Sequence, residues 1–485
     1  MDKKHAIILL LFINLYCLNG NAQSYSLTDL LNMSSSTLDF KIIEAEKEIN
    51  EYDKRLFKLQ ILPQIRMTAT LPNITNSISP ITLGDGSEKY VNRAYMTSAL
   101  SLNLSQLVPF TGGTISLSSS LNRLDNFAPQ RNKSYNLNLF NLSYSQNLSI
   151  FNQYKWDKKI LLKQNELFDI SQIQHREKIY MSIVDLFFNL LLAQKKEELN
   201  HLMENNATVV YNKALALYSL GRIPQSELLN AEITKNKYNY SSVQVEKLRC
   251  QKALAAKTNL VSDNPLVTFD FDYFDSCSLT YQIDELIERT IKYGEGIQRE
   301  LEELTEERDL RKMKASGLPS ISLSFGGGYN SQDEEFRQLV DAPSRNFSAV
   351  VSIGIPVLSW GENRNRVNRL KAENKISELK YKDAINNLMT STRYELECLP
   401  LLIESIIASK KAIRVLYLQL QELTEQYDYG RVSSLKINDV QKEIIQVELS
   451  RIEYAKQVFN IRHKYRMMAL YDVFEGNAIT ANSKL

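Results

Sequence analysis

The sequence predicts a mainly α-helical protein that also contains β-strands, arranged as two tandem helix–β–helix–helix repeats. Three features predict this fold class: a motif that occurs twice, two long segments without glycine, and two segments of alternating apolar and polar residues. The hexapeptide YSLGRI at residues 218–223 recurs as YDYGRV at residues 427–432, an offset of 209. Solenoid repeats have periods of about 20–50 residues, so an offset of this length indicates duplication of a whole structural unit.

Other motif pairs extend the repeat. The stretch NLSIFNQYK at residues 147–155 aligns with PVLSWGENR at residues 356–364, again at an offset of 209. The Leu-Pro pairs that precede the β-rich segments, at Pro63 and Pro319, are instead 256 residues apart. The first repeat therefore carries about 47 additional residues in its β-rich part. The sequence leaves open whether these residues add a hairpin to the same sheet or lie beside it.

Two segments are expected to form unusually long helices. Residues 155–220 contain neither glycine nor proline, and residues 362–429 contain no glycine and only one proline, Pro400. A helix of about 60 residues would be roughly 100 Å long, whereas helices in globular proteins average about 11–12 residues. Helices of this length need neighbours along their sides, as in a coiled coil. A kink is expected at Pro400, because proline removes a helical hydrogen bond.

The twin hexapeptides are predicted to be the tips of helix hairpins. A glycine after a long helix can adopt the left-handed conformation that ends the helix, because it has no Cβ. In the second copy, Ser433 and Ser434 are suited to cap the following helix. Each motif therefore predicts two antiparallel helices joined by a sharp turn.

The β-rich segments alternate leucine or isoleucine with serine or asparagine. Examples are SALSLNLSQL at residues 98–107 and GTISLSSSL at residues 113–121. Strands of about ten residues with this alternation fit a transmembrane β-barrel with lipid outside and water inside. The same alternation fits half-buried strands of a soluble sandwich. A secretory signal at the N-terminus favours the barrel.

That signal consists of Lys3 and Lys4 followed by a run of 13 mostly apolar residues, AIILLLFINLYCL. The run is too short to span a membrane as a helix and has the organisation of a cleaved signal peptide. Lipidation at Cys17 is the alternative, and the bulky Tyr16 before it disfavours that modification. We expect four regions: a signal peptide at 1–22, a first repeat at 23–270, a second repeat at 271–475 and a C-terminal tail at 476–485.

Composition argues against several functions. The chain has 58 basic and 56 acidic residues, a balance that does not suggest a nucleic-acid-binding protein. It has four cysteines and four histidines, and it lacks both the phosphate-binding G-x-x-x-x-G-K-[ST] loop and the zinc-binding H-E-x-x-H motif. We therefore expect no enzymatic activity, no cofactor and no metal site.

The order and spacing of these motifs resemble the TolC-type outer-membrane efflux proteins. The resemblance extends from about Ser24 to Phe474. It rests on the Leu-Pro pairs, on the twin tips, and on SIGIPVLSWGENRNRV at residues 352–367, where a strand ends and a long helix begins.

The resemblance implies a homotrimer in the cell outer membrane. Three chains would form one β-barrel in outer-membrane lipid, and their long helices would form a hollow α-helical barrel across the periplasm. The far end would meet a periplasmic adaptor (membrane fusion) protein and an inner-membrane transporter. The assembly would be the passive conduit of a tripartite efflux or type I secretion system, through which small molecules or proteins leave the cell.

The resemblance also assigns roles to residues at the two tips. Adaptor docking is implied for Gly221, Arg222, Gly430 and Arg431. The periplasmic entrance is implied for Tyr427, which would help to hold it closed, and for Asp439, which would line it. The two arginines could instead bind the last carbonyl groups of their helices, and Asp439 could lie on a solvated helix face.

The alternative function is that of an exported coiled-coil scaffold or adhesin without a channel. A scaffold accounts for the long helices and the signal peptide. It does not account for two β-rich segments at matching places in the repeats.

Overall fold

The computed structural model describes residues 24–82, 84–148, 151–237, 240–260, 264–341, 343–429 and 431–479. The predicted signal peptide, the tip glycine Gly430 and residues 480–485 of the predicted tail lie outside these ranges. The chain forms two compact units. Unit 1 contains the described residues of Met1–Lys47, Leu167–Gln298 and Lys382–Leu485, and unit 2 contains those of Glu48–Glu166 and Arg299–Tyr381. Each unit draws on both predicted repeats.

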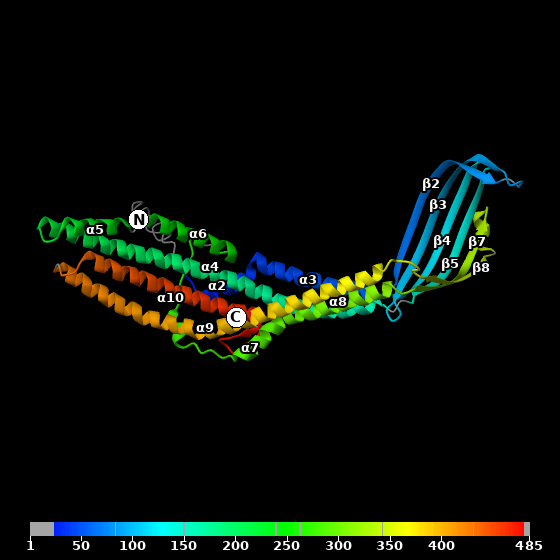
Figure 1. Ribbon diagram of the computed structural model, residues 1–485. Coiled ribbons are helices and arrows are strands. Elements are labelled where there is room, and N and C mark those ends of the chain that lie inside the picture. The colour runs from blue at the N-terminus through cyan, green and yellow to red at the C-terminus, as the bar shows by residue number, and fades with distance from the viewer. Residues whose placement is uncertain are drawn as a thin grey trace, which may run out of the picture. The chain divides into compact units, whose positions relative to one another are not determined.

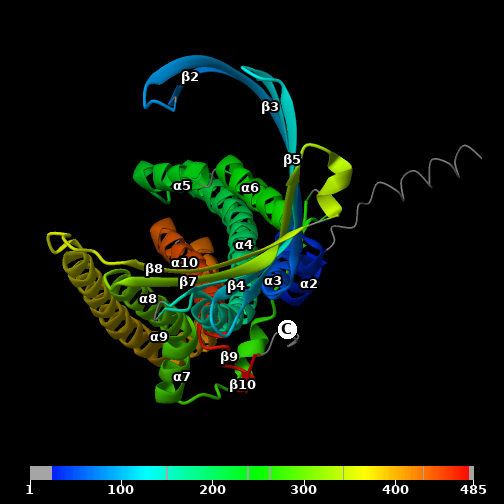
Figure 2. The ribbon, with the colours of Figure 1, turned by 90° about the vertical axis from the view of Figure 1, so that its right-hand side faces the viewer.

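Unit 2 contains a six-stranded antiparallel sheet (Figure 1). The strand order is β2 (Gln64–Thr82), β3 (Glu88–Val108), β4 (Gly113–Ala128), β5 (Asn132–Asn147), β7 (Ser320–Asp333) and β8 (Ser344–Gly354). The first predicted repeat supplies four strands and the second supplies two. The additional hairpin of the first repeat therefore belongs to the same sheet, and Gly112, at φ +77°, lies in the β3–β4 turn. Figure 2 shows that the sheet is curved, with β2 and β8 at its two ends.

Pairing in the sheet separates apolar from polar side chains. Leu104 lies opposite Leu117, and the next residue along, Ser105, lies opposite Ser116. Because successive side chains of a strand point to opposite faces, the sheet has one face rich in leucine and one rich in serine and asparagine. We call these the apolar face and the polar face. The apolar face is uncovered within its unit: the side chain of Leu102 is 47% exposed. The sandwich alternative, which requires a second sheet over this face, is not the arrangement observed.

Two helices of 67 residues each, α4 (Gln153–Ser219) and α9 (Glu362–Asp428), contribute residues to both units. Their first and last residues are each separated by 209 positions, the offset of the twin hexapeptides. Helix α9 continues through Pro400. Within unit 2, the first turns of α4 contact α3 (Leu38–Leu59) through stacked rings of Phe57 and Tyr154, whose centroids are 5.2 Å apart.

Unit 1 is a layer of helices that run side by side (Figure 1). Besides parts of α4 and α9 it contains α5 (Gln225–Lys237), α6 (Tyr240–Thr258) and α10 (Ser434–Met468). Its main core forms where α4, α9 and α10 meet, around Phe187, Phe188, Leu399 and Phe459. The three aromatic side chains bury large apolar surfaces there, which stabilises the middle of the helices.

Shorter elements complete the described chain: β1 (Ser24–Tyr25) paired with β6 (Leu266–Val267), β9 (Tyr471–Asp472) paired with β10 (Asn477–Ala478), and the helices α2 (Leu27–Met33), α7 (Ile283–Thr290) and α8 (Ile297–Ser316). One-turn helices occupy Ser34–Ser36, Phe271–Asp275, Ile291–Gly296 and Phe336–Val340. In the part of the chain that the structure describes, no helix is long and apolar enough to cross a membrane.

A buried ion network fixes the end of α10 in unit 1. Glu177 of α4 accepts hydrogen bonds from His463 (2.8 Å) and Arg466 (3.1 Å). Arg466 also pairs with Asp472, which in turn accepts from Arg462 at 2.8 Å. Burial alone would raise the pKa of Asp472, but the hydrogen bond and charge of Arg462 lower that pKa to about 2. The segment after α10 is therefore held by charges that remain ionised in the folded protein.

Candidate functional site: the paired helix tips

The first tip ends helix α4 with two characteristic hydrogen bonds. The backbone N–H of Arg222 donates to the carbonyl of Leu217 (2.9 Å), and that of Gly221 donates to the carbonyl of Tyr218 (2.9 Å). This is the Schellman arrangement, which needs a left-handed residue after the helix. Gly221 has φ +69°, and a Cβ at this position would meet nothing within 4 Å. Backbone conformation, and not space, therefore selects glycine, as the sequence predicts.

The second tip repeats the geometry of the first. The N–H of Arg431 donates to the carbonyl of Gln426 at 3.1 Å. Both residues lie 209 positions after Arg222 and Leu217, which form the same bond in the first tip. Gly430 lies outside the described residues, so its role as the left-handed cap remains a prediction. Both tips lie at the same end of unit 1 (Figure 1).

A carboxylate from the first tip caps the helix of the second. The N–H and the hydroxyl of Ser434 both donate to Oε1 of Glu227, each at 2.7 Å. Ser433 occupies the N-cap position of α10 without a capping bond from its side chain. The expectation that serine hydroxyls cap this helix is therefore wrong: Glu227 of α5 does so. A negative charge at a helix N-terminus is favourable, because the backbone dipoles leave partial positive charge there.

Tyr427 is buried beneath the tips. Its side chain is 2% exposed and packs among apolar residues of α4, α9 and α10, a cluster that we call the tip core: Leu199, Met203, Leu416, Leu420, Ile437, Val440 and Ile444. Among the described residues, none forms a hydrogen bond with its hydroxyl. Burial, together with the negative charge of Glu227, raises the pKa of Tyr427 to about 12. The phenol is therefore neutral at physiological pH, and in the single chain it contributes to the core beneath the tips.

The other predicted residues lie on the surface. The guanidinium of Arg431 lies 5.5 Å from the ring centre of Tyr429, an exposed cation–π pair, and Arg222 is exposed on the first tip. Asp439 is exposed on α10 and pairs with Lys442 at 3.3 Å. The structure thus brings the two arginines to the same end of the unit, while Tyr427 lies inside and Asp439 faces solvent on the helix that follows the second tip.

Sequence reasoning missed the contacts that join the two tips. Besides Glu227 and Ser434, the amide of Asn438 donates to the hydroxyl of Thr234 at 2.7 Å, again between α10 and α5. These partners are 207 and 204 residues apart in the chain. Glu227, in the first turn of its own helix, carries the ordinary signal of an acidic N-terminal residue, so the sequence alone gives no sign that it caps a distant helix.

Comparison with known proteins agrees with this geometry. Residues 305–463 match the family model described as outer membrane efflux protein. The cation efflux system protein CusC of Escherichia coli strain K12 is 25% identical over 150 residues, which are 30% of this chain and 32% of that protein. The match thus spans about a third of the curated relative's length.

Solved structures share the fold over most of the chain. A structure of CusC has a TM-score of 0.61 at 16% identity, covering 91% of both chains. The Campylobacter jejuni CmeC outer membrane channel has a TM-score of 0.64 at 15% identity, covering 94% of this chain and 87% of that one. The Neisseria gonorrhoeae MtrE outer membrane channel, in its open state, has a TM-score of 0.59 at 14% identity, covering 91% and 88%.

Long helices that end in paired tips, together with an antiparallel sheet, define a protein with the fold of these channels. Residues 305–463 match the outer membrane efflux proteins, and most of the chain shares the fold of these channels, as the sequence motifs predict.

Proposed function

We propose that the chain is one subunit of a passive outer-membrane channel that serves as the exit duct of a tripartite efflux or type I secretion system. The observation that carries this proposal is the uncovered apolar face of a sheet with two free edges. Large apolar surfaces exposed to water are unfavourable and usually mark an interaction surface. Lipid against this face would remove it from water.

The two edge strands support closure of the sheet with further copies of the chain. Strands β2 and β8 each pair on one side only, and their side chains are among the most exposed apolar groups: Met67 of β2 is 67% exposed and Phe347 of β8 is 79% exposed. Unpaired backbone groups are not tolerated within a bilayer, so an open edge must be closed by another strand. Pairing β2 of one copy with β8 of the next satisfies both edges.

A homotrimer built in this way would have 18 strands, six from each chain. Barrels of 16–18 strands leave an aqueous channel, whereas barrels of about eight strands are filled by their own side chains. The additional hairpin of the first repeat therefore bears directly on the width of the proposed pore.

Helix surfaces next to the edge strands support the same assembly. Ile49, Tyr52, Leu56 and Leu59 of α3 are exposed at spacings of three, four and three residues, which is the pattern of a coiled-coil seam. Helix α3 precedes the edge strand β2, and α9, with exposed Ile376 and Leu379, follows the edge strand β8. Pairing of β2 with β8 between copies would bring the exposed apolar residues of α3 and α9 together and bury both sets.

The tips are proposed to dock the periplasmic adaptor and, through it, the inner-membrane transporter. Exposed Leu220, Tyr429 and Leu435 provide apolar contacts beside Arg222 and Arg431. Aromatic and arginine side chains are enriched where protein partners bind. We further propose that the mature protein lacks residues 1–22 and resides in the outer membrane with its helical part in the periplasm.

Membrane fractionation separates the channel from a coiled-coil scaffold or adhesin. We expect the protein to remain in the outer-membrane fraction through washes with high salt and with alkaline carbonate, and to be released by detergent. Release by salt alone would favour the scaffold, whose attachment would be electrostatic. The uncovered apolar face of the sheet supports retention in the outer-membrane fraction until detergent is added.

A further inference from the structure

The polar face of the sheet has an unusual composition. In four adjacent strands, residues of this face are assigned by their pairing: Ser101, Asn103 and Ser105 of β3, Ser116, Ser118, Ser120 and Asn122 of β4, Asn136, Asn138, Asn141, Ser143 and Ser145 of β5, and Ser324, Gly326, Gly328 and Asn330 of β7. These side chains are small or are able to form hydrogen bonds, and none is ionised at physiological pH. The centre of the face is therefore a neutral, hydrogen-bonding surface.

The charges of this face, among the described strand residues, are all basic. Arg66 lies opposite Asn103, near the end of the sheet that joins the helices, and Arg93 lies opposite Ser77, near the loop end. Lys89 lies on the same face of β3, four residues before Arg93. Within these paired rows the face carries no carboxylate, imidazole or sulfur. The side chains of this face are therefore uncharged at its centre and basic towards both ends.

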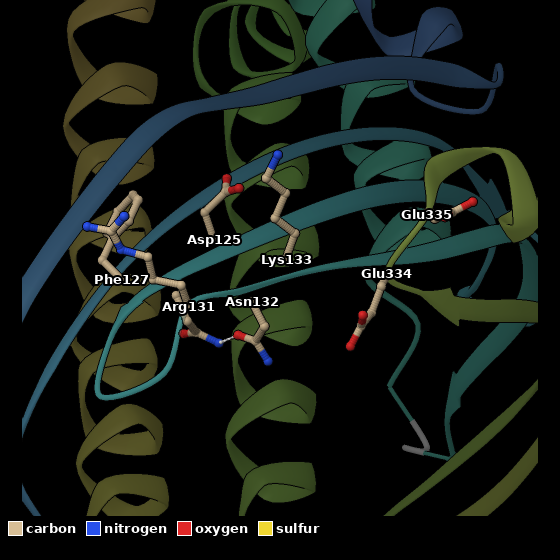
Figure 3. Close-up of a pocket in the computed structure, with 8 residues that line it drawn as sticks. Asp125, Phe127, Arg131, Asn132, Lys133, Glu334 and Glu335 are labelled. Atoms are coloured by element: carbon tan, nitrogen blue, oxygen red, sulfur yellow. Dashed lines mark hydrogen bonds between the residues drawn. The ribbon is translucent and has the colours of Figure 1, made fainter.

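The carboxylates of the sheet lie elsewhere. Asp125 and Asp333 project from the opposite face, where Asp125 pairs with Arg123 at 2.8 Å. Glu334 and Glu335 follow β7 and line a surface pocket of about 620 Å³ at the loop end, together with Arg131 and Lys133 (Figure 3). Acidic side chains are thus present in the sheet but absent from one face of it.

We propose that the polar face is the wall of the membrane channel and that this wall admits anionic and uncharged solutes at least as readily as cations. The inference rests on the proposed channel function and adds a charge class of cargo to it. Selectivity in pores depends on rings of charged side chains, and symmetry would repeat each basic residue in every copy. A wall whose side chains attract cations would need carboxylates, which the described strand residues of this face lack. The name of the relative CusC, a cation efflux protein, therefore does not predict a cation-selective wall here.

Cysteine accessibility tests the proposal in the assembled protein. Cys250, Cys277 and Cys398 are first replaced by serine, and Ser118→Cys is introduced at the centre of the polar face. Leu117→Cys, the neighbouring residue on the apolar face, is the matched control. Outer membranes are treated with methanethiosulfonates that carry either a sulfonate or a trimethylammonium group. Each rate is divided by the rate of the same reagent with a free thiol.

We expect Ser118→Cys to react with both reagents, with a normalised rate for the anionic reagent equal to or above that for the cationic one, and Leu117→Cys to be protected. Adding Arg93→Gln and Lys89→Gln should lower the anionic rate relative to the cationic rate. A severalfold preference for the cationic reagent at Ser118→Cys would overturn the proposal while leaving a water-filled channel. Absence of reaction with either reagent, when the denatured protein reacts, would overturn the channel itself.

Discussion

Glu227 of the first helix tip and Ser434 of the second are joined by two hydrogen bonds of 2.7 Å to one carboxylate oxygen. Ser434 is 1% exposed, so this contact is shielded from water. It is also the start of helix α10, whose first free N–H groups need an acceptor. The two tips of one chain are therefore a single structural element, and a substitution at one tip should alter the stability of the other.

We predict that Glu227→Ala loosens the second tip. The substitution leaves the N–H and hydroxyl of Ser434 buried without an acceptor, and a hydrogen bond to a charged group is worth about 1.5–3 kcal/mol. Hydrogen exchange at residues 434–437 should become faster in the variant. Glu232→Ala, at an exposed position of the same helix, is the control and should leave exchange unchanged. Unaltered protection in Glu227→Ala would show that the contact does not hold the two tips together.

Gly221→Pro should disrupt the first tip without preventing membrane assembly. Proline cannot adopt φ +69°, and it lacks the N–H that Gly221 donates to Tyr218. Asparagine tolerates the left-handed region, so Gly221→Asn is expected to retain the turn. We expect faster proteolysis at residues 218–224 in the proline variant only, with both variants extracted from the outer membrane as oligomers. Loss of the oligomer in the Gly221→Asn variant would contradict the expectation that changes at Gly221 leave membrane assembly intact.

The buried ion network predicts a loss of stability at acid pH. The pKa of Asp472 is lowered to about 2 in the folded protein, and the pKa of Glu177 is also lowered, because His463 and Arg466 outweigh the effect of burial. A carboxylate with a lowered folded pKa stabilises the protein above its unfolded pKa, about 4. This stabilisation is lost as pH falls from about 4 towards 2, because the unfolded chain binds protons first.

Burial of His463 acts in the same direction. Burial lowers the pKa of this imidazole, although Glu177 opposes the shift. The unfolded histidine therefore takes up a proton at a higher pH than the folded one, and stability begins to fall below about pH 6.5. The midpoint of unfolding in urea, measured between pH 8 and pH 3, should decrease as the pH falls below about 6.5 and decrease further as it falls below about 4.

Asp472→Asn tests the carboxylate part of this prediction. We expect the variant to lose about 2 kcal/mol of stability at neutral pH, because Arg462 and Arg466 each lose one carboxylate partner and retain Glu475 and Glu177, respectively. Its stability should also depend less on pH below about 4. Glu443→Gln, an exposed change on α10, is the control. If the stability of Asp472→Asn falls as steeply at acid pH as that of the unchanged protein, Asp472 is excluded as the source of the acid sensitivity.

Leu56→Glu should prevent assembly of the proposed homotrimer while preserving the fold of the single chain. Leu56 is exposed on the α3 stripe, so a charge there costs little in the monomer but is buried if the stripe is a seam between copies. Lys58→Glu, off the stripe on the same helix, is the control. Native mass spectrometry in detergent should show monomers for Leu56→Glu and oligomers for the control. Normal oligomers in Leu56→Glu would exclude α3 as a seam.

The sequence predicted the long helices and their ends well, because local signals determine them. Gly221 ends α4 as expected, and the offset of 209 between the hexapeptides reproduces both ends of the two 67-residue helices. The number of strands was not predictable: the second repeat has a single hairpin, so comparison of the repeats could not show that the additional hairpin of the first joins the same sheet.

Two other features depend on long-range contacts that residue patterns do not reveal. Alternation of leucine and serine is the same in a sandwich and in a single sheet, and only the uncovered side chain of Leu102 and its neighbours distinguishes them. Likewise, Ser433 and Ser434 have the local sequence of a capped helix, but the cap comes from Glu227, which is 207 residues from Ser434. Tertiary contact overrode local preference at that position.

Electron cryomicroscopy of the detergent-extracted protein tests the central claim most directly. The proposed channel predicts a particle with three-fold symmetry, a closed ring of 18 strands and a hollow helical stem on the order of 100 Å long. A monomer, or a solid helical rod whose sheet remains open, would contradict the claim and would favour an exported scaffold.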